Sequence, residues 1–186
     1  MRARRGRQVS PRLGRFRSAA GRAVHQRWYR AAMALLPPPD RTADTTTSYG
    51  TVRTYAWSGP DGADASPVLL LPGRSAGAPM WAANLPEFRT THRVLAVDAL
   101  GDAGLSVQTA PLRTPDDQAR WIDEVVTSVA PEGVHVVGHS FGGATAAQYA
   151  SRCPGHVRSL VLLEPVFTSP GRRCRCSAGP RSVRCR

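Results

Sequence analysis

The chain has 186 residues, 41% of them hydrophobic and 20% charged, which is typical of one globular domain rather than of a disordered or membrane protein. No apolar run approaches the roughly 20 residues that span a bilayer, and the Arg-rich start lacks the apolar segment of a secretory signal, so we expect a cytoplasmic protein without a membrane span. The net charge of +12 is concentrated at the ends: residues 1–30 contain ten Arg and no acid, residues 171–186 contain six Arg and no acid, and the segment between has nine Arg against thirteen acids.

The chain is predicted to begin with a disordered Arg-rich arm over residues 1–20 and a helix over residues 21–36. Val24, Trp28 and Leu35 recur at helical spacing, and Pro37 ends the helix. A basic amphipathic helix of this kind can lie on a membrane. We expect instead that its Trp face packs on the domain.

Short apolar runs then alternate with helical stretches along the chain. We predict strands at 51–57, 68–71, 94–97, 134–137 and 160–163, and helices at 79–86, 115–129 and 141–152. Alternating buried strands and helices predict an α/β fold with a doubly wound, mostly parallel sheet and helices on both faces. This domain is expected over residues 21–168, followed by a disordered Arg/Cys-rich tail over residues 169–186.

The strand that ends at Val137 runs directly into Gly138-His139-Ser140-Phe141-Gly142, and a helix rich in small residues follows. A G-x-S-x-G sequence between a strand and a helix is typical of a nucleophile elbow, where glycines allow a turn tight enough to expose the Ser hydroxyl. We predict that Ser140 is a nucleophile. The backbone N–H of Phe141, at the positive end of the helix, is predicted to face the oxyanion that acyl transfer creates.

Three other segments accompany this elbow: Leu70-Leu71-Pro72-Gly73-Arg74, residues 97–106 and residues 153–165. With them the chain resembles the α/β-hydrolase fold family, and within it the bacterial carboxylesterase-like members, from about Trp28 to Phe167. In this resemblance Pro72 stands where the oxyanion loop usually has His. The resemblance implies a serine-dependent carboxylic ester hydrolase that needs no cofactor and acts on a small-molecule ester, with the backbone N–H of Arg74 as the second oxyanion donor.

The resemblance also implies that the domain is incomplete after the sixth strand of the family's sheet. The family's general-base His follows the last strand, and its acid follows the seventh or the sixth, which leaves Glu164 as a possible acid beside a structural role for that carboxylate. No residue among the chain's five histidines matches the base: His25, His92, His135, His139 and His156. We therefore expect little or no activity from this chain, and an exposed apolar edge at the sixth strand.

After Phe167 the sequence loses its acids and its apolar periodicity, and we predict a truncating frameshift there. The Cys residues have no spacing typical of zinc, so no metal is expected. Asp98 follows a predicted strand and is expected to organise a loop rather than to act as the catalytic acid.

Two alternative functions stay open. An Arg-rich binding protein on an inactive hydrolase scaffold would hold RNA, DNA or acidic lipid through its basic ends, but no nucleic-acid motif is present, so no specific nucleic acid is expected. An acyltransferase or perhydrolase of the same fold would pass the acyl group from Ser140 to another acceptor. An Asp nucleophile is disfavoured because Ser stands at the elbow. The sequence does not determine the substrate or the oligomeric state.

Overall fold

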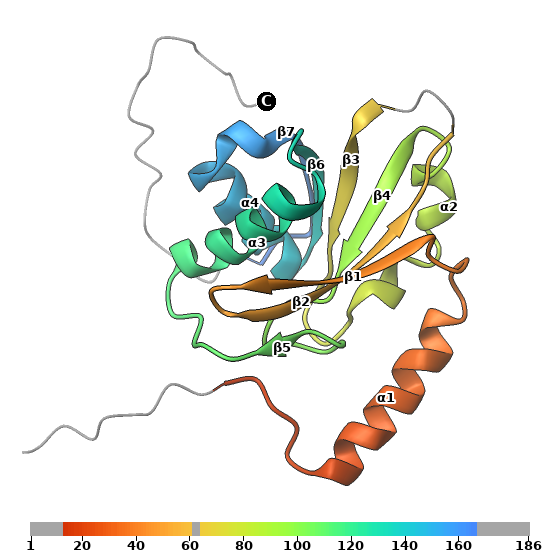
Figure 1. The fold of residues 1–186 in the computed structure, drawn as a ribbon, viewed down its shortest axis with the longest axis vertical. Helices are drawn as coiled ribbons and strands as arrows, with labels where there is room; N and C mark the ends of the chain where they lie inside the picture. The colour runs from red at the N-terminus through yellow and green to blue at the C-terminus, as the bar shows by residue number, and fades with distance from the viewer. Residues whose placement is uncertain (1–12, 61–63, 167–186) are drawn as a thin grey trace, which may run out of the picture.

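The computed structural model describes residues 13–60 and 64–166, so the predicted tail and frameshift and residues 1–12 of the predicted arm lie outside the described residues. Its strands form one sheet in the order β1-β2-β4-β3-β6-β7, with β5 paired to β2 (Figure 1). The strands are β1 (Arg41–Thr47), β2 (Gly50–Trp57), β3 (Asp64–Leu71), β4 (His92–Val97), β5 (Val107–Gln108), β6 (Val134–His139) and β7 (Val157–Leu163).

Strands β3, β4, β6 and β7 are parallel to one another, whereas β1 and β2 form an antiparallel hairpin that joins the sheet at β4. The chain runs from β3 outward to β4, and then returns to β6 and β7 on the other side of β3. This confirms the doubly wound, mostly parallel sheet. It also places the carboxyl ends of β3, β4 and β6 at the same edge, where open α/β sheets bind ligands.

Helices cover both faces of the sheet, as predicted. The helical elements are α1 (Ala19–Met33), η1 (Ala78–Trp81), α2 (Leu85–Phe88), α3 (Pro115–Val129), α4 (Phe141–Arg152) and η2 (Pro154–His156). On one face α3 and α4 bury Trp121, Ile122 and Tyr149 against the strands, and on the other face Trp81 and Leu85 pack with α1. Among the described helices, none combines the length and the apolar character that crossing a bilayer requires.

Two strands, β1 and β5, were not predicted, and one predicted helix is divided. The strand β1 was not predicted, because its Thr-rich sequence is mostly exposed at the sheet edge and lacks an apolar run. The helix predicted over residues 79–86 is divided into η1 and α2, and each of these short helices has a proline in its first turn. Pro86 has no amide hydrogen to donate within one continuous helix over residues 79–86, but it is tolerated as the second residue of α2, where the amide needs no helical partner.

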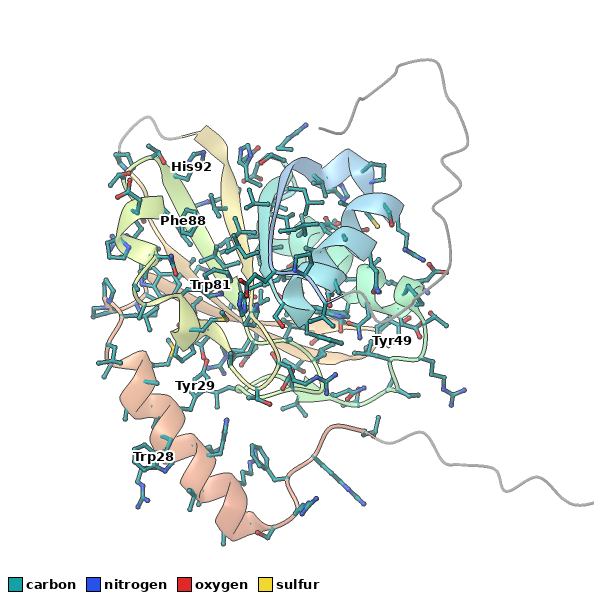
Figure 2. The ribbon with its side chains drawn as sticks, turned by 180° about the vertical axis from the view of Figure 1, so that it is seen from behind. Trp28, Tyr29, Tyr49, Trp81, Phe88 and His92 are labelled. Carbon is teal, nitrogen blue, oxygen red and sulfur yellow. The ribbon has the colours of Figure 1, made fainter. Side chains whose placement is uncertain are left out.

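The packing of α1 also differs from the prediction. Trp28 is 66% exposed, whereas the neighbouring Tyr29 is buried. Figure 2 shows Trp28 on the outer side of the helix and Tyr29 on the side toward the sheet. The expectation that the helix packs by its Trp face is therefore wrong, because Tyr29 can bury its ring and still place its hydroxyl on a buried carboxylate, Asp98.

Strand β7 ends the order of strands in the sheet and exposes apolar side chains. Leu160, Val161 and Leu163 are each more than a third exposed. The predicted apolar edge is therefore observed at β7, and such an edge favours pairing with other chains.

The first turn of α3 contains a carboxylate whose ionisation is coupled to folding. Asp117 accepts hydrogen bonds from the amides of Arg113 (2.7 Å) and Thr114 (2.8 Å) and from the hydroxyl of Tyr49 (2.8 Å), which connects the helix to the β1–β2 turn. Led by the Arg113 amide, these bonds lower the pKa of Asp117 from its ordinary 3.8 to about 2.

We predict that Asp117→Asn destabilises the fold above about pH 4 but not near pH 2. Because the folded-state pKa lies below the unfolded-state value, ionised Asp117 stabilises the fold above the unfolded-state pKa, and this contribution disappears as the pH falls from about 4 to about 2. Urea unfolding of both proteins across this range tests it. Asp116→Asn, in an exposed pair with Arg152, is the control and should have little effect at any pH. A difference for Asp117→Asn that persists at pH 2 would contradict the assignment.

Candidate active site

Ser140 lies at the junction of β6 and α4 in a strained backbone conformation. Its φ of 52° and ψ of −114° are rarely adopted by a residue with a side chain. The turn is held from β7, because the Ser140 amide donates to Leu163 O (2.9 Å) and the Val166 amide donates to Ser140 O (3.1 Å). Within the described residues the Ser140 hydroxyl has no hydrogen-bond partner.

Close backbone contacts explain the glycines of the elbow. A Cβ atom on Gly138 would lie 2.5 Å from Gly142 O, and one on Gly142 would lie 2.3 Å from Leu71 O. Both distances are far below van der Waals contact, and the atoms met are backbone atoms that cannot move aside. Glycine at these positions is therefore what allows β6, α4 and the end of β3 to meet around Ser140.

The loop after β3 lies directly beside the nucleophile. A Cβ atom on Gly73 would be 3.5 Å from the Ser140 Cβ. The loop is fixed by the Gly73 amide, which donates to the Met80 sulfur (3.2 Å), and by the Ser75 amide, which donates to Asp102 (2.8 Å). Ser75 has a φ of 62°, so this turn is strained as well.

The two amides predicted to bind an oxyanion come from this loop and from the start of α4. In the described part of the chain, the N–H groups of Arg74 and Phe141 donate to no other protein group. The Arg74 guanidinium lies over the Phe141 ring, 4.5 Å from its centroid. This cation–π contact holds together the two segments from which the amides project.

A cavity of about 330 Å³ opens beside these two residues. Its walls come from the loops after β3 and β4, from α3 and the first turn of α4, and also from the segment before α1 and from β5. The lining includes Leu71, Arg74, Leu100, Trp121, Phe141 and Thr145. The cavity is large enough for a small organic group and mixes apolar side chains with a few polar ones, as ligand sites do.

Asp98 organises the loops around the site, as the sequence analysis expected. Its buried carboxylate accepts the Tyr29 hydroxyl (2.7 Å), the Ala78 amide (2.9 Å) and the Leu105 amide (2.7 Å). Burial raises the pKa of Asp98, while these hydrogen bonds oppose the rise. Asp98 thus joins α1, the loop that follows β3 and the loop that follows β4.

Three of the histidines lie at the opposite edge of the sheet. His92 begins β4, His135 is the second residue of β6, and His156 immediately precedes β7. At about 3.3 Å per strand residue, His135 is roughly 16 Å from Ser140. Figure 2 shows His92 at the end of the sheet away from Tyr29 and α1.

The other two histidines are His25 in α1 and His139 at the end of β6. The His25 ring lies between those of Phe16 and Tyr29, with centroids 5.0 and 5.9 Å away and the ring planes tilted. His139 precedes the nucleophile, and its Nδ1 lies 2.8 Å from the position that a Cβ on Gly73 would take. That nitrogen is buried and has no hydrogen-bond partner in the described structure.

Glu164 lies immediately after β7, next to the segment that holds the Ser140 backbone. It is exposed and has a φ of 45°. Among the described residues, the Glu164 carboxylate forms no ion pair with an arginine.

Sequence reasoning missed the parts of the site that come from distant segments. Tyr29 lies 69 residues before its partner Asp98, and Asp102 fixes Ser75 across 27 residues. No local pattern indicates either contact. The turn-rich sequence between Asp98 and Ser106 was the only signal that this loop has a special structure.

Comparison with known proteins places these features in context. A profile described as alpha/beta hydrolase fold matches residues 66–172, more than half of the chain. The chain is 31% identical over 140 residues to an uncharacterized carboxylesterase, nap, of Bacillus subtilis, covering 75% of this chain and 46% of the relative. It is 31% identical over 137 residues to carboxylesterase YbfK of the same organism, covering 74% and 45%.

Solved structures agree with the sequence relatives. The crystal structure of naproxen esterase (carboxylesterase NP) from Bacillus subtilis superposes with a TM-score of 0.72 at 28% identity, covering 81% of this chain and 52% of that one. The chain therefore spans about half the length of the curated relatives it matches.

We predict that Gly142→Ala destabilises the domain by about 1–3 kcal/mol or prevents folding, because the added methyl group meets the Leu71 and Pro72 carbonyl oxygens. Gly155→Ala is the matched control, since a Cβ atom there meets nothing within 4 Å. It should change stability by no more than about 0.5 kcal/mol. Thermal unfolding measures both, and equal effects of the two variants would contradict the close-approach argument.

Removing the Tyr29 hydroxyl with Tyr29→Phe should cost about 1.5–3 kcal/mol, since it deletes a hydrogen bond to a buried carboxylate. Tyr55→Phe is the comparison, because the Tyr55 hydroxyl bonds the neutral Tyr29 hydroxyl (3.0 Å) and lies 3.5 Å from the carboxylate. Its effect in urea unfolding should be clearly smaller. The assignment fails if Tyr55→Phe costs as much as Tyr29→Phe.

Proposed function

Because the chain belongs to the alpha/beta hydrolase fold family, we propose that Ser140 is the nucleophile of a serine-dependent carboxylic ester hydrolase. The relatives named as carboxylesterases support this reaction class. The main structural support is the strained turn at Ser140, which is held by backbone contacts at Gly138 and Gly142.

In the proposed reaction the Ser140 Oγ attacks the carbonyl carbon of an ester. A bond forms between Oγ and this carbon, the carbonyl π pair moves onto the oxygen, and the hydroxyl proton leaves to a base. The amides of Arg74 and Phe141 would stabilise the oxyanion, because both are held in place by the turn and the loop and have no acceptor among the described residues. Collapse of the tetrahedral intermediate expels the alkoxide, which takes up a proton, and water then releases the acid by the same sequence.

The cavity beside Arg74 and Phe141 is the proposed site for one side of the ester. Its apolar walls at Leu71, Leu100 and Trp121 suit an uncharged organic group. We therefore propose a small-molecule ester, and no part of the reaction requires a cofactor.

Among the described residues, none is hydrogen-bonded to the Ser140 hydroxyl as a general base would be. A general base must lie within hydrogen-bond reach of the nucleophile. His92, His135 and His156 are at the wrong edge of the sheet. His25 packs between Phe16 and Tyr29, and His139 lies against Gly73, so neither is hydrogen-bonded to Ser140. We propose that the chain by itself is a very weak esterase for this reason, and that Glu164 is a candidate acid only when a base is also present.

We predict weak turnover of p-nitrophenyl acetate and slow labelling by a fluorophosphonate, both abolished by Ser140→Ala. Serine hydrolases that lose their histidine retain a rate about 10³–10⁴ above the uncatalysed one, from the oxyanion site and binding. Added imidazole should increase turnover in proportion to its concentration, because it can take the Ser140 proton from solution. The Ser140→Ala variant should show only the background reaction with imidazole.

The controls separate the nucleophile from the base. His139→Gln should leave the imidazole-dependent rate intact if His139 is not the base. Rapid turnover by the chain alone that depends on Ser140 would contradict the missing-base proposal, and its loss in His139→Gln would identify the base. Turnover that survives Ser140→Ala would refute Ser140 as the nucleophile.

A further inference from the structure

The outer face of α1 is an apolar stripe with no protein covering it in the described structure. Val24, Trp28 and Leu35 lie four and seven residues apart, which puts them on one side of the helix and the turn that extends it. Their side chains are 48%, 66% and 76% exposed. Exposed aliphatic and Trp side chains grouped in this way mark an interaction surface. We call these three residues the outer stripe.

The opposite face of α1 fixes this orientation. Tyr29 is buried and donates its hydroxyl to Asp98 (2.7 Å), and Leu36 is buried at the end of the same segment. Trp57 donates its indole N–H to Pro37 O (2.9 Å), which holds the chain where it leaves the helix. The helix therefore cannot rotate its outer stripe into the core without breaking these contacts.

The charge around the outer stripe is of one sign. Arg27 and Arg30 are both exposed on α1, about 100° and 160° around the helix from Trp28, and the Arg27 guanidinium lies 6.0 Å from the centroid of the Trp28 ring. The sequence has no acidic residue before Asp40. A surface that pairs exposed Trp, Val and Leu with arginines is complementary to an anionic surface that also accepts apolar side chains.

We propose that α1 docks the protein on an anionic lipid membrane, with the outer stripe inserted at the level of the headgroups, Arg27 paired with lipid phosphate and Arg30 adding to the positive charge of the helix. Trp is favoured at this depth because its ring is apolar and its N–H is polar. Each arginine near an anionic leaflet adds to the attraction. The inference goes beyond the ester hydrolysis proposed above and does not depend on it.

Other occupants fit the stripe less well. A second copy of the chain would bring Arg27 and Arg30 near their own equivalents, with no acid on this face to balance them. Residues 167–186 also contain only basic charges, so they would be repelled from the same face. A nucleic acid would attract the arginines, but its phosphates offer nothing to Val24 and Leu35.

The test uses Trp28 as its own reporter. Of the four Trp residues in the chain, Trp57, Trp81 and Trp121 are buried, so Trp28 dominates any change in quenching by acrylamide. The 186-residue chain is mixed with vesicles of phosphatidylcholine or of an equimolar mixture with phosphatidylglycerol. We expect a blue shift of the emission, protection from acrylamide and co-sedimentation with the anionic vesicles alone, and no spectral change in Trp28→Phe.

Matched variants assign the binding to this face. Arg27→Glu/Arg30→Glu should weaken partitioning by about tenfold or more, since two attractive charges become repulsive. Trp28→Ala/Leu35→Ala should weaken it by a similar factor through lost apolar insertion. Arg113→Glu/Arg120→Glu makes the same change of charge at α3 on the other face of the sheet and should leave partitioning unchanged. Circular dichroism and unfolding of each variant confirm that the fold is retained.

Several outcomes would overturn the proposal. Equal binding to neutral vesicles would remove the anionic partner, and binding that survives Arg27→Glu/Arg30→Glu would assign it to another basic segment. Self-association that Trp28→Ala/Leu35→Ala abolishes would assign the stripe to a second copy. Tighter binding to poly(U) than to anionic vesicles, lost in the same variants, would assign it to nucleic acid.

Discussion

Around Ser140 three pieces of backbone meet so closely that no side chain fits between them. The end of β3 approaches Gly142, and the start of α4 approaches Gly138. The last residue of β7 accepts from the Ser140 amide, and the segment after β7 donates to the Ser140 carbonyl. This convergence holds Ser140 at a positive φ. It also fixes the position of the first turn of α4 relative to Ser140. The remaining features of the candidate site, including the Arg74 loop and the cavity, are arranged around this turn.

The second organising group is the buried carboxylate of Asp98. Burial of an acid in an apolar site is costly unless donors surround it, and here the donors come from three separate segments. One of them is Tyr29 of α1, so the same group that shapes the loops of the site also anchors the N-terminal helix. The exposure of Trp28 follows from this anchoring, because the two side chains point to opposite sides of the helix.

The site therefore has a well-formed turn at Ser140, but none of the described residues forms the hydrogen bond to its hydroxyl that a general base would make. The polarity of the strands explains this combination. Parallel strands bring their carboxyl ends to one edge, so residues at their beginnings, such as His92 and His135, are kept at the other. Only His139 lies beside the elbow, and its contact is with Gly73. Strand β7 exposes the apolar side chains of Leu160 and Val161 at the edge of the sheet, and such an edge favours association with other chains.

By itself the sequence determined the doubly wound sheet, most of its strands and the elbow at Ser140, because these depend on local periodicity and on glycines within a few residues of one another. It did not reveal β1, whose exposed Thr residues give no apolar run, or the division of the predicted 79–86 helix. Only the tertiary structure decided that Tyr29 rather than Trp28 faces the core. That choice depends on a hydrogen bond across 69 residues, which no local pattern records.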